Sequence, residues 1–211
     1  MRGLFVVVEG LDRAGKSTQV SRLASALDAK AIKFPGNIPR EDRTTAIGKM
    51  IDSYLVQQSE LDDRAIHLLF SANRWEARQG IVTCLESGKN IVCDRYAFSG
   101  IAYSCAKGLS YQWCKAPDVG LPEPDVTIFL DLSVEEASRR GGYGEERYES
   151  VSMQSKVREA FAQIRKDMPQ GKWVVVDAGK SVDEVAAECE SVVRSLAKPS
   201  SASLAPLFAQ Q

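Results

Sequence analysis

The amino-acid sequence predicts an α/β domain built on a five-stranded parallel sheet with helices on both faces. Five short apolar segments alternate with longer segments of helical periodicity, and the first apolar segment runs directly into a glycine-rich motif. Crossovers of this kind are right-handed, so they bury a parallel sheet between two helical layers. With 211 residues and 44% hydrophobic composition, we expect one domain over residues 1–197 and a loosely held tail over residues 198–211.

Composition and charge narrow the class of protein. The formal net charge of −1 gives no field for nucleic acid or an anionic membrane, so phosphate binding must come from locally placed groups. Five cysteines without C-x-x-C spacing predict reduced thiols rather than a zinc site or a disulfide framework. No segment resembles a targeting signal or a membrane span, so we expect a soluble protein of the cytoplasm, with the nucleus as the alternative. The single histidine, His67, is expected to be structural.

Residues 10–17, GLDRAGKS, fit the phosphate-binding pattern G-x-x-x-x-G-K-[ST], called the P-loop below. An apolar strand is predicted before this loop over residues 4–8, and a helix after it over residues 17–27. The two glycines let the backbone turn its N–H groups towards an anion, and the helix N-terminus points to the same place. Lys16 supplies charge for the outer phosphates, and the Ser17 hydroxyl is placed to ligate magnesium. The motif therefore predicts a nucleoside triphosphate site.

A second short strand is predicted over residues 31–34, followed by a loop rich in proline and other turn-forming residues. Ligands collect at the carboxyl ends of strands in open α/β sheets, which brings Arg40 and Arg43 near the P-loop by topology alone. Two solvated arginines are the alternative.

Two helices are predicted next, over residues 44–57 and over residues 62–87. Phe70 and Arg74 lie one turn apart on the second helix, a spacing that can present an aromatic face and a guanidinium to a planar base. From spacing alone, core packing of Phe70 and a surface salt bridge of Arg74 are the favoured explanation.

A third buried strand over residues 91–93 ends in two opposite charges, Asp94 and Arg95. An aspartate at this position can hold the magnesium shell through water, and an arginine beside it can bridge phosphates. The alternative is a structural ion pair at the sheet edge. The helix expected over residues 97–106 then carries Ser99 and Tyr103 one turn apart.

The rest of the chain continues the alternation of helices and strands. Prolines mark a loop over residues 117–124, and the remaining elements are a strand at 126–130, helices at 134–140 and 153–168, a strand at 173–176 and a helix at 182–196. Residues 139–148 combine three arginines with three glycines, and we expect a mobile lid that closes over the phosphates. A charged surface loop would have the same composition.

Four segments together resemble the thymidylate kinase family. They are EGLDRAGKSTQ at residues 9–19, LFSANRWE at 69–76, DRYAFSG at 94–100 and PDVGLP at 117–122. The likeness runs from the first strand to the helix near residue 160, and it is far more specific than a P-loop alone. It implies the P-loop nucleoside monophosphate kinase fold with a mobile lid, and a homodimer.

The resemblance also implies a reaction, in which the γ-phosphoryl group of ATP, bound with Mg²⁺, is transferred to thymidine monophosphate (dTMP). The implied catalytic residues are Asp12, Arg13, Lys16 and Arg95. The implied ATP-binding residues are Gly10, Asp12, Arg13, Ala14, Gly15, Lys16, Ser17, Thr18 and Arg140. The implied dTMP-binding residues are Asp12, Phe34, Arg43, Phe70, Arg74, Arg95, Ser99, Tyr103 and Tyr148, and the implied metal ligands are Ser17 and Asp94.

Individual roles follow from the same resemblance. Arg13 marks the class that keeps its catalytic arginine in the P-loop rather than in the lid, where it would neutralise charge on the transferring group. Asp12 would accept a hydrogen bond from the sugar 3′-hydroxyl, and Arg95 would bridge the acceptor and donor phosphates. Asp94 would act through magnesium or its water.

The base and sugar contacts are implied in the same way. Phe70 would stack on thymine while Arg74 donates to its carbonyl, which reverses the interpretation from spacing alone. Tyr103 would pack where a ribose 2′-hydroxyl would intrude, and Tyr148 would belong to the lid side of this pocket. Arg140 would flank adenine together with residues 177–181.

The chain departs from the family pattern after Phe34-Pro35, where residues 36–41 are an apparent insertion. The family usually places a phosphate-gripping arginine one residue after this Phe-Pro pair. The family register resumes at residues 43–48 and assigns the contact to Arg43 rather than Arg40.

Other function classes make different demands on the sequence. A kinase for another or several nucleoside monophosphates, such as dUMP, UMP, CMP or a purine nucleotide, is the main alternative and would differ at Phe70, Arg74 and Tyr103. A regulatory GTPase is nearly excluded because the chain has no Asn-Lys-x-Asp motif. A non-catalytic nucleotide-binding protein would be expected to lack Arg13 or Arg95, and both are present.

Overall fold

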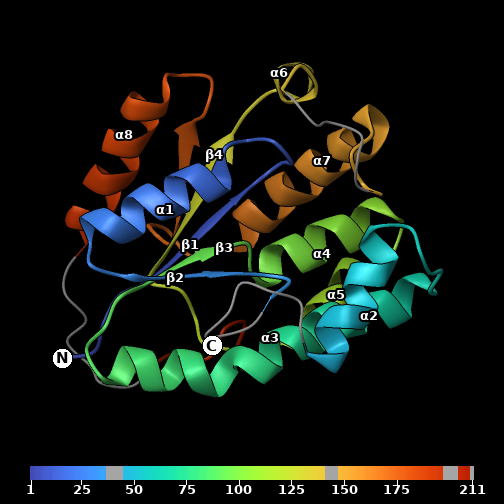
Figure 1. Cartoon of the computed structure of the whole chain (residues 1–211), viewed down its shortest axis with the longest axis horizontal. Helices are drawn as coiled ribbons and strands as arrows, with labels where there is room; N and C mark the ends of the chain where they lie inside the picture. Colours follow the sequence, from blue (N-terminus) through green and yellow to red (C-terminus); the bar gives the residue numbers. More distant parts are fainter. Residues whose placement is uncertain (37–44, 141–146, 197–203, 210–211) are drawn as a thin grey trace.

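The computed structural model describes residues 1–36, 45–140, 147–196 and 204–209, and these form an α/β fold around a five-stranded parallel sheet (Figure 1). The strand order is β2-β3-β1-β4-β5. The strands are β1 (Phe5–Gly10), β2 (Lys30–Lys33), β3 (Ile91–Asp94), β4 (Val126–Asp131) and β5 (Trp173–Asp177). The predicted fold class and sheet are therefore confirmed.

Every predicted helix is present, with bounds that differ from the prediction by a few residues. The helices are α1 (Lys16–Ala26), α2 (Ala46–Leu55), α3 (Asp63–Glu86), α4 (Ala97–Ala106), α6 (Val134–Ser138), α7 (Val151–Asp167) and α8 (Val182–Arg194). Capping residues define where several helices begin. The Asp62 carboxylate accepts a hydrogen bond from Arg64 N at 2.8 Å at the start of α3, and Ser181 and Glu184 form a capping box at the start of α8.

Two short helices lie between α4 and β4, and neither is predicted from the sequence. They are α5 (Tyr111–Lys115) and the 3₁₀ helix η1 (Ala116–Asp118). A contact from α3 holds them in place. The buried side chain of His67 lies 2.9 Å from the Cys114 carbonyl of α5 through Nε2, and 2.7 Å from Ser104 Oγ of α4 through Nδ1. His67 therefore has the structural role that we expected.

The central strand β1 shows why the sheet is covered on both faces. Phe5 and Val7 pack into the cluster formed with α2, α3, α4 and α7, whereas Val6 and Val8 pack into the cluster formed with α1 and α8. All four side chains are fully buried, so the strand has a continuous apolar run instead of an alternating pattern. Figure 1 shows α1 and α8 together on one side of the sheet and α3 on the other.

The sheet topology brings separate turns to one edge. β1 lies between β3 and β4, and Val8 of β1 and Lys33 of β2 both pair in register with Asp94 of β3. Since all strands are parallel, the P-loop after β1 and the Asp94-Arg95 turn after β3 leave the sheet side by side. This is the position where open α/β sheets bind ligands.

The end of the chain corrects one prediction. Within the tail, which we expected to be loosely held, residues 204–209 lie against the segment before β4. Leu207 N donates to Leu121 O at 2.7 Å, Gly120 N donates to Leu207 O at 3.0 Å, and the Leu207 side chain is 1% exposed. Leu204, Leu207 and Phe208 all pack on the core, but three apolar residues beside two prolines and several serines are too few to predict a regular element from the sequence. In the described part of the chain, no helix has both the length and the apolar surface to cross a bilayer.

Candidate active site

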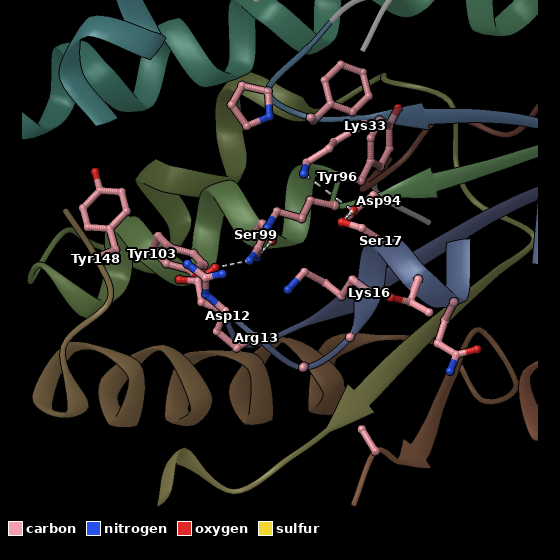
Figure 2. Close-up of a pocket in the computed structure, with 18 of the residues that line it drawn as sticks. Asp12, Arg13, Lys16, Ser17, Lys33, Asp94, Tyr96, Ser99, Tyr103 and Tyr148 are labelled. Carbon is pink, nitrogen blue, oxygen red and sulfur yellow. Dashed lines mark hydrogen bonds and ion pairs between the residues drawn. The ribbon is translucent and has the colours of Figure 1, made fainter. Parts of the chain in front are cut away.

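A cleft of about 580 Å³ lies at the carboxyl edge of the sheet, between the P-loop, the turn after β3, and helices α3 and α4. Figure 2 shows polar side chains converging on it from the P-loop, the end of β3 and α4. The predicted site residues that line it are Asp12, Arg13, Ala14, Gly15, Lys16, Ser17, Thr18, Phe34, Phe70, Arg74, Asp94, Arg95, Ser99, Tyr103, Arg140 and Tyr148. Gly10 ends β1 just behind the wall, and Arg43 lies outside the described residues.

The P-loop backbone explains the two glycines of its motif. Gly15 caps α1 with a φ of 91°, and Gly10 has a φ of 151°. A Cβ on Gly10 would lie 2.7 Å from the Leu130 carbonyl oxygen, so no larger residue fits there. Arg13 adopts a φ of 63°, an uncommon value outside glycine and asparagine that concentrates at functional sites. The helix that begins at Lys16 therefore directs its N-terminal dipole into the cleft.

Lys16 is buried inside the loop and donates to the Leu11 carbonyl at 2.5 Å. Burial and the nearby Arg95 charge lower the pKa of Lys16 to about 8, although three neighbouring carboxylates oppose the shift. The ammonium is thus destabilised in the free protein, and a bound polyanion would stabilise it.

Asp12 accepts hydrogen bonds from side chains on several elements around the cleft. Its Oδ1 accepts from Arg95 Nη2, and its Oδ2 accepts from Tyr103 Oη at 2.8 Å and from Gln154 Nε2 at 2.7 Å. Burial raises the pKa of Asp12, but the charges of Arg95 and Lys16 outweigh it, and the net pKa is lowered. An ionised carboxylate with this many donors can accept a further hydrogen bond from a sugar hydroxyl.

Gln154 joins the P-loop to the chain that follows residues 141–146. It is fully buried on α7, its Oε1 accepts from Asp12 N at 3.1 Å, and its Nε2 also donates to the Tyr148 carbonyl at 3.0 Å. Gln154 could not be predicted from the sequence, because one glutamine in an amphipathic helix carries no signal of this kind.

Glu9 holds the turn that carries Arg95. Its Oε1 accepts from Tyr96 N at 2.8 Å and from Ser99 N at 3.1 Å, and its Oε2 accepts from Ser99 Oγ at 2.5 Å. No local side chain caps α4, so a carboxylate from β1 caps it instead. Arg95 has a φ of 67° and donates from Nη1 to Ser99 Oγ at 3.0 Å. We assigned no role to Glu9 from the sequence, although it stands in the first segment that resembles the family.

Asp94 and Ser17 form an oxygen-rich corner beside the P-loop. Ser17 Oγ donates to Asp94 Oδ2 at 2.6 Å, and the Lys33 ammonium lies 4.0 Å from the same oxygen (Figure 2). Asp94 Oδ1 is buried without a hydrogen-bond partner in the described part of the chain. A hydroxyl and an unsatisfied carboxylate oxygen are the donors that a hard divalent cation prefers.

The two flanks of the expected lid both reach the P-loop, although residues 141–146 lie outside the described residues. Arg140 donates to the Arg13 carbonyl at 2.7 Å and to the Ala178 carbonyl at 3.1 Å. Arg13 Nε donates to Glu149 Oε1 at 2.8 Å. Glu149 is not among the residues predicted from the sequence.

Phe70 and Arg74 both line the cleft. Phe70 also packs against the core cluster, as the spacing alone indicated, whereas the surface salt bridge expected for Arg74 is wrong. Phe70 is only partly buried and faces the cleft wall rather than lying deep in the core. Arg74 is 2% exposed, and its ion pair with Asp118 is buried rather than at the surface. Tyr103 and Tyr148 complete this wall, with ring centroids 5.3 Å apart.

Comparisons with known proteins agree with this geometry. A family model described as thymidylate kinase matches residues 8–189. A thymidylate kinase from Schizosaccharomyces pombe is 48% identical over 199 residues, covering 91% of this chain and 92% of the relative. One from Homo sapiens is 46% identical over 190 residues, covering 87% and 86%. A solved thymidylate kinase from Candida albicans, described as having broad substrate specificity, is 43% identical with a TM-score of 0.82, covering 92% of each chain.

The pKa of Lys16 predicts how affinity for ATP depends on pH. Below pH 8 the ammonium is present in the free protein, and above pH 8 it deprotonates, so the Kd for ATP should rise by up to about tenfold per pH unit. Calorimetric titration between pH 7 and pH 10 measures this. Lys16→Arg keeps its charge throughout and should flatten the dependence, whereas a flat profile in the unmodified protein would contradict the prediction.

Proposed function

Because this chain belongs to the thymidylate kinase family and converts dTMP into thymidine diphosphate, we propose that its P-loop holds ATP and that α3 and α4 hold dTMP. The observation that carries this division is Asp12, which lies in the P-loop and contacts both Arg95 and Tyr103 on the opposite side of the cleft. The two phosphate groups would meet there.

The ATP side combines backbone amides with fixed charges. The N-terminus of α1 and Lys16 face the same volume, which suits the β- and γ-phosphates. Arg140, Ala178 and Val182 line the cleft beyond the P-loop, where the adenine would lie. Thr18 lies in the first turn of α1 and completes this side.

The dTMP side has an aromatic end and a cationic end. Phe34, Phe70 and Tyr148 line the wall for the nucleoside, while Arg95 and Ser99 lie towards the P-loop for the phosphate. Tyr103 donates to Asp12 and so fills the space next to the sugar. From the sequence, Arg43 remains the proposed second phosphate contact.

Catalysis at this site needs positioning and charge stabilisation rather than a general base. A phosphate oxygen of dTMP is already nucleophilic, and negative charge spreads over the transferring group in the transition state. Arg95 would bring the two phosphates together, and Arg13 and Lys16 would stabilise that charge. This proposal places the protein in the class with its catalytic arginine in the P-loop.

Nucleotide kinases of this family use ATP with magnesium, and we propose that Ser17 and Asp94 hold the ion. The unsatisfied Asp94 Oδ1 and the Ser17 hydroxyl fit the preference of magnesium for oxygen donors. When bound there, magnesium would neutralise negative charge on the phosphates of ATP. Chelation by EDTA should abolish transfer.

We also propose a homodimer, with α3 and η1 in the interface. Leu68 and Trp75 lie two turns apart on α3 and are 46% and 39% exposed, and Val119, just after η1, is 46% exposed. Trp75 packs beside Gly120, so these apolar side chains form one surface. Light scattering should give twice the 23.1 kDa chain mass, and Trp75→Arg should shift it towards the monomer. A monomeric unmodified protein would reject the proposal.

The cytoplasm or nucleus is the proposed location. All five cysteines are free and three of them are buried, which fits a reducing compartment. Recovery of the protein in an oxidising compartment after cell fractionation would contradict this.

An assay of ADP release with a panel of acceptors tests the proposed site. With ATP and Mg²⁺, dTMP should give the highest kcat/KM among dTMP, dUMP, dCMP, UMP, CMP, dGMP and ribothymidine monophosphate. The last differs from dTMP only by the 2′-hydroxyl that Tyr103 would exclude. Equal use of several acceptors would favour a broad nucleoside monophosphate kinase, the property described for the Candida albicans relative.

Arg13 should act on the transition state more than on binding. Arg13→Ala should lower kcat by about a hundredfold or more while the KM for ATP changes much less, because the charge that Arg13 stabilises develops during transfer. Steady-state kinetics measures both, with Arg22→Ala as a control for an exposed arginine on α1. A large rise in KM with kcat intact would show that Arg13 only binds ATP.

A further inference from the structure

We propose that Asp118 is a positioning residue that fixes Arg74 as a selector for a carbonyl group on the acceptor base. This inference rests on the proposed function of α3 and α4 as the dTMP side of the cleft. It adds a residue from η1, outside the predicted site, and a stated chemistry for what it selects.

Asp118 holds Arg74 through two parallel hydrogen bonds. Arg74 Nε donates to Asp118 Oδ1 at 3.1 Å, and Arg74 Nη2 donates to Asp118 Oδ2 at 2.6 Å. Asp118 is fully buried, and Ser71 Oγ donates to its Oδ1 at 2.7 Å. A bidentate pair of this kind fixes the plane of the guanidinium as well as its position.

Gly100 supports the guanidinium from the side of α4. A Cβ at Gly100 would lie 2.8 Å from Arg74 Nη2, 3.0 Å from Nη1 and 3.2 Å from Cζ. The guanidinium therefore lies against the helix backbone at a place where any other residue would displace it. Both Gly100 and Arg74 line the cleft.

The two supports leave one end of Arg74 for a ligand. Nη1 donates no hydrogen bond to any residue in the described ranges, so its two N–H groups remain for a ligand in the cleft. A guanidinium donates and never accepts, so this end can bind a base carbonyl but not an exocyclic amino group. A freely moving arginine could turn away from the wrong base, whereas this one cannot.

The Asp118 charge has a second consequence. Arg74 and Asp118 form a neutral pair, so Arg74 has little excess charge to attract the phosphate of the acceptor. Arg95 also has a carboxylate partner, Asp12, but it lies beside the P-loop, so we place the acceptor phosphate at Arg95 rather than at Arg74. The nucleotide would therefore bind in one direction, with its base at Arg74.

The variant Asp118→Asn tests the proposal, because it keeps the shape of the side chain but removes the charge and one acceptor. We expect the KM and the calorimetric Kd for dTMP to rise about tenfold or more, with kcat changed less than about threefold. The preference for dTMP over dCMP in kcat/KM should fall by a similar factor. Unchanged binding and an unchanged preference in a folded variant would overturn the proposal.

A matched control exists at the other end of the sheet. Arg2 and Asp125 form a similar, largely buried bidentate pair at 2.7 and 2.6 Å, and Asp125 also accepts from Phe5 N at the start of β1. Asp125→Asn should lower the melting temperature as Asp118→Asn does, but leave dTMP binding unchanged. If both variants weaken dTMP binding equally, the effect of Asp118 is only structural.

Two further variants keep the outcome decisive. If Asp118→Asn does not fold, Gly100→Ala takes its place and should raise the Kd for dTMP about fivefold or more by displacing the guanidinium; no change would overturn the proposal. If Arg74→Met leaves dTMP binding intact, the proposed contact between Arg74 and the base is wrong, and the role of Asp118 is then wrong as well. If Arg74→Met weakens binding but Asp118→Asn and Gly100→Ala do not, only this inference is wrong.

Discussion

The contact between Asp12 and Arg95 joins the two turns on which the site depends. One turn follows β1 and the other follows β3, and the parallel pairing of these strands brings both to one edge. Glu9, near the end of β1, caps the N-terminus of α4. The position of Arg95 therefore depends on a residue that lies 86 positions earlier in the sequence. A shift of either strand would separate Asp12 from Arg95, the two residues that we propose at the point of phosphoryl transfer.

Polar groups in this region are buried at a cost that only complete hydrogen bonding offsets. Glu9 shows the cost directly, since burial raises its pKa while Arg95 and the donors of Ser99 and Tyr96 lower it. In Asp94, one oxygen is left without a partner in the part of the chain that the structure describes. Gln19 Oε1, in the same cleft, also lacks a partner among the described residues, and the unsatisfied Asp94 oxygen lies where we propose a metal ligand.

The three arginines of the cleft differ in what surrounds them. Arg74 is neutralised by a fully buried carboxylate, Arg95 shares a partly exposed one with Tyr103, and Arg13 pairs with Glu149 beside the cleft opening. Removing one partner of a fully buried pair costs about 3–5 kcal/mol, and this applies to Arg74 and Asp118, whose side chains are 3% and 0% exposed. The Arg74 guanidinium is therefore held in place before any nucleotide arrives. In the proposed mechanism, arginine serves base recognition, phosphate bridging and transition-state stabilisation within a single cleft.

The sequence by itself determined the features that are local along the chain. Apolar runs and helical periodicity gave the strands and helices, and the P-loop, with the Asp94-Arg95 turn, gave the position of the site, because these signals involve neighbouring residues. Only the tertiary structure decided which polar groups meet: Gln154 with Asp12, Glu9 with Tyr96, and Asp118 with Arg74 are separated by 142, 87 and 44 residues. The packed tail, α5 and η1 were missed for the same reason. A contact between distant segments depends on how the sheet and helices pack, and no pattern of neighbouring residues encodes it.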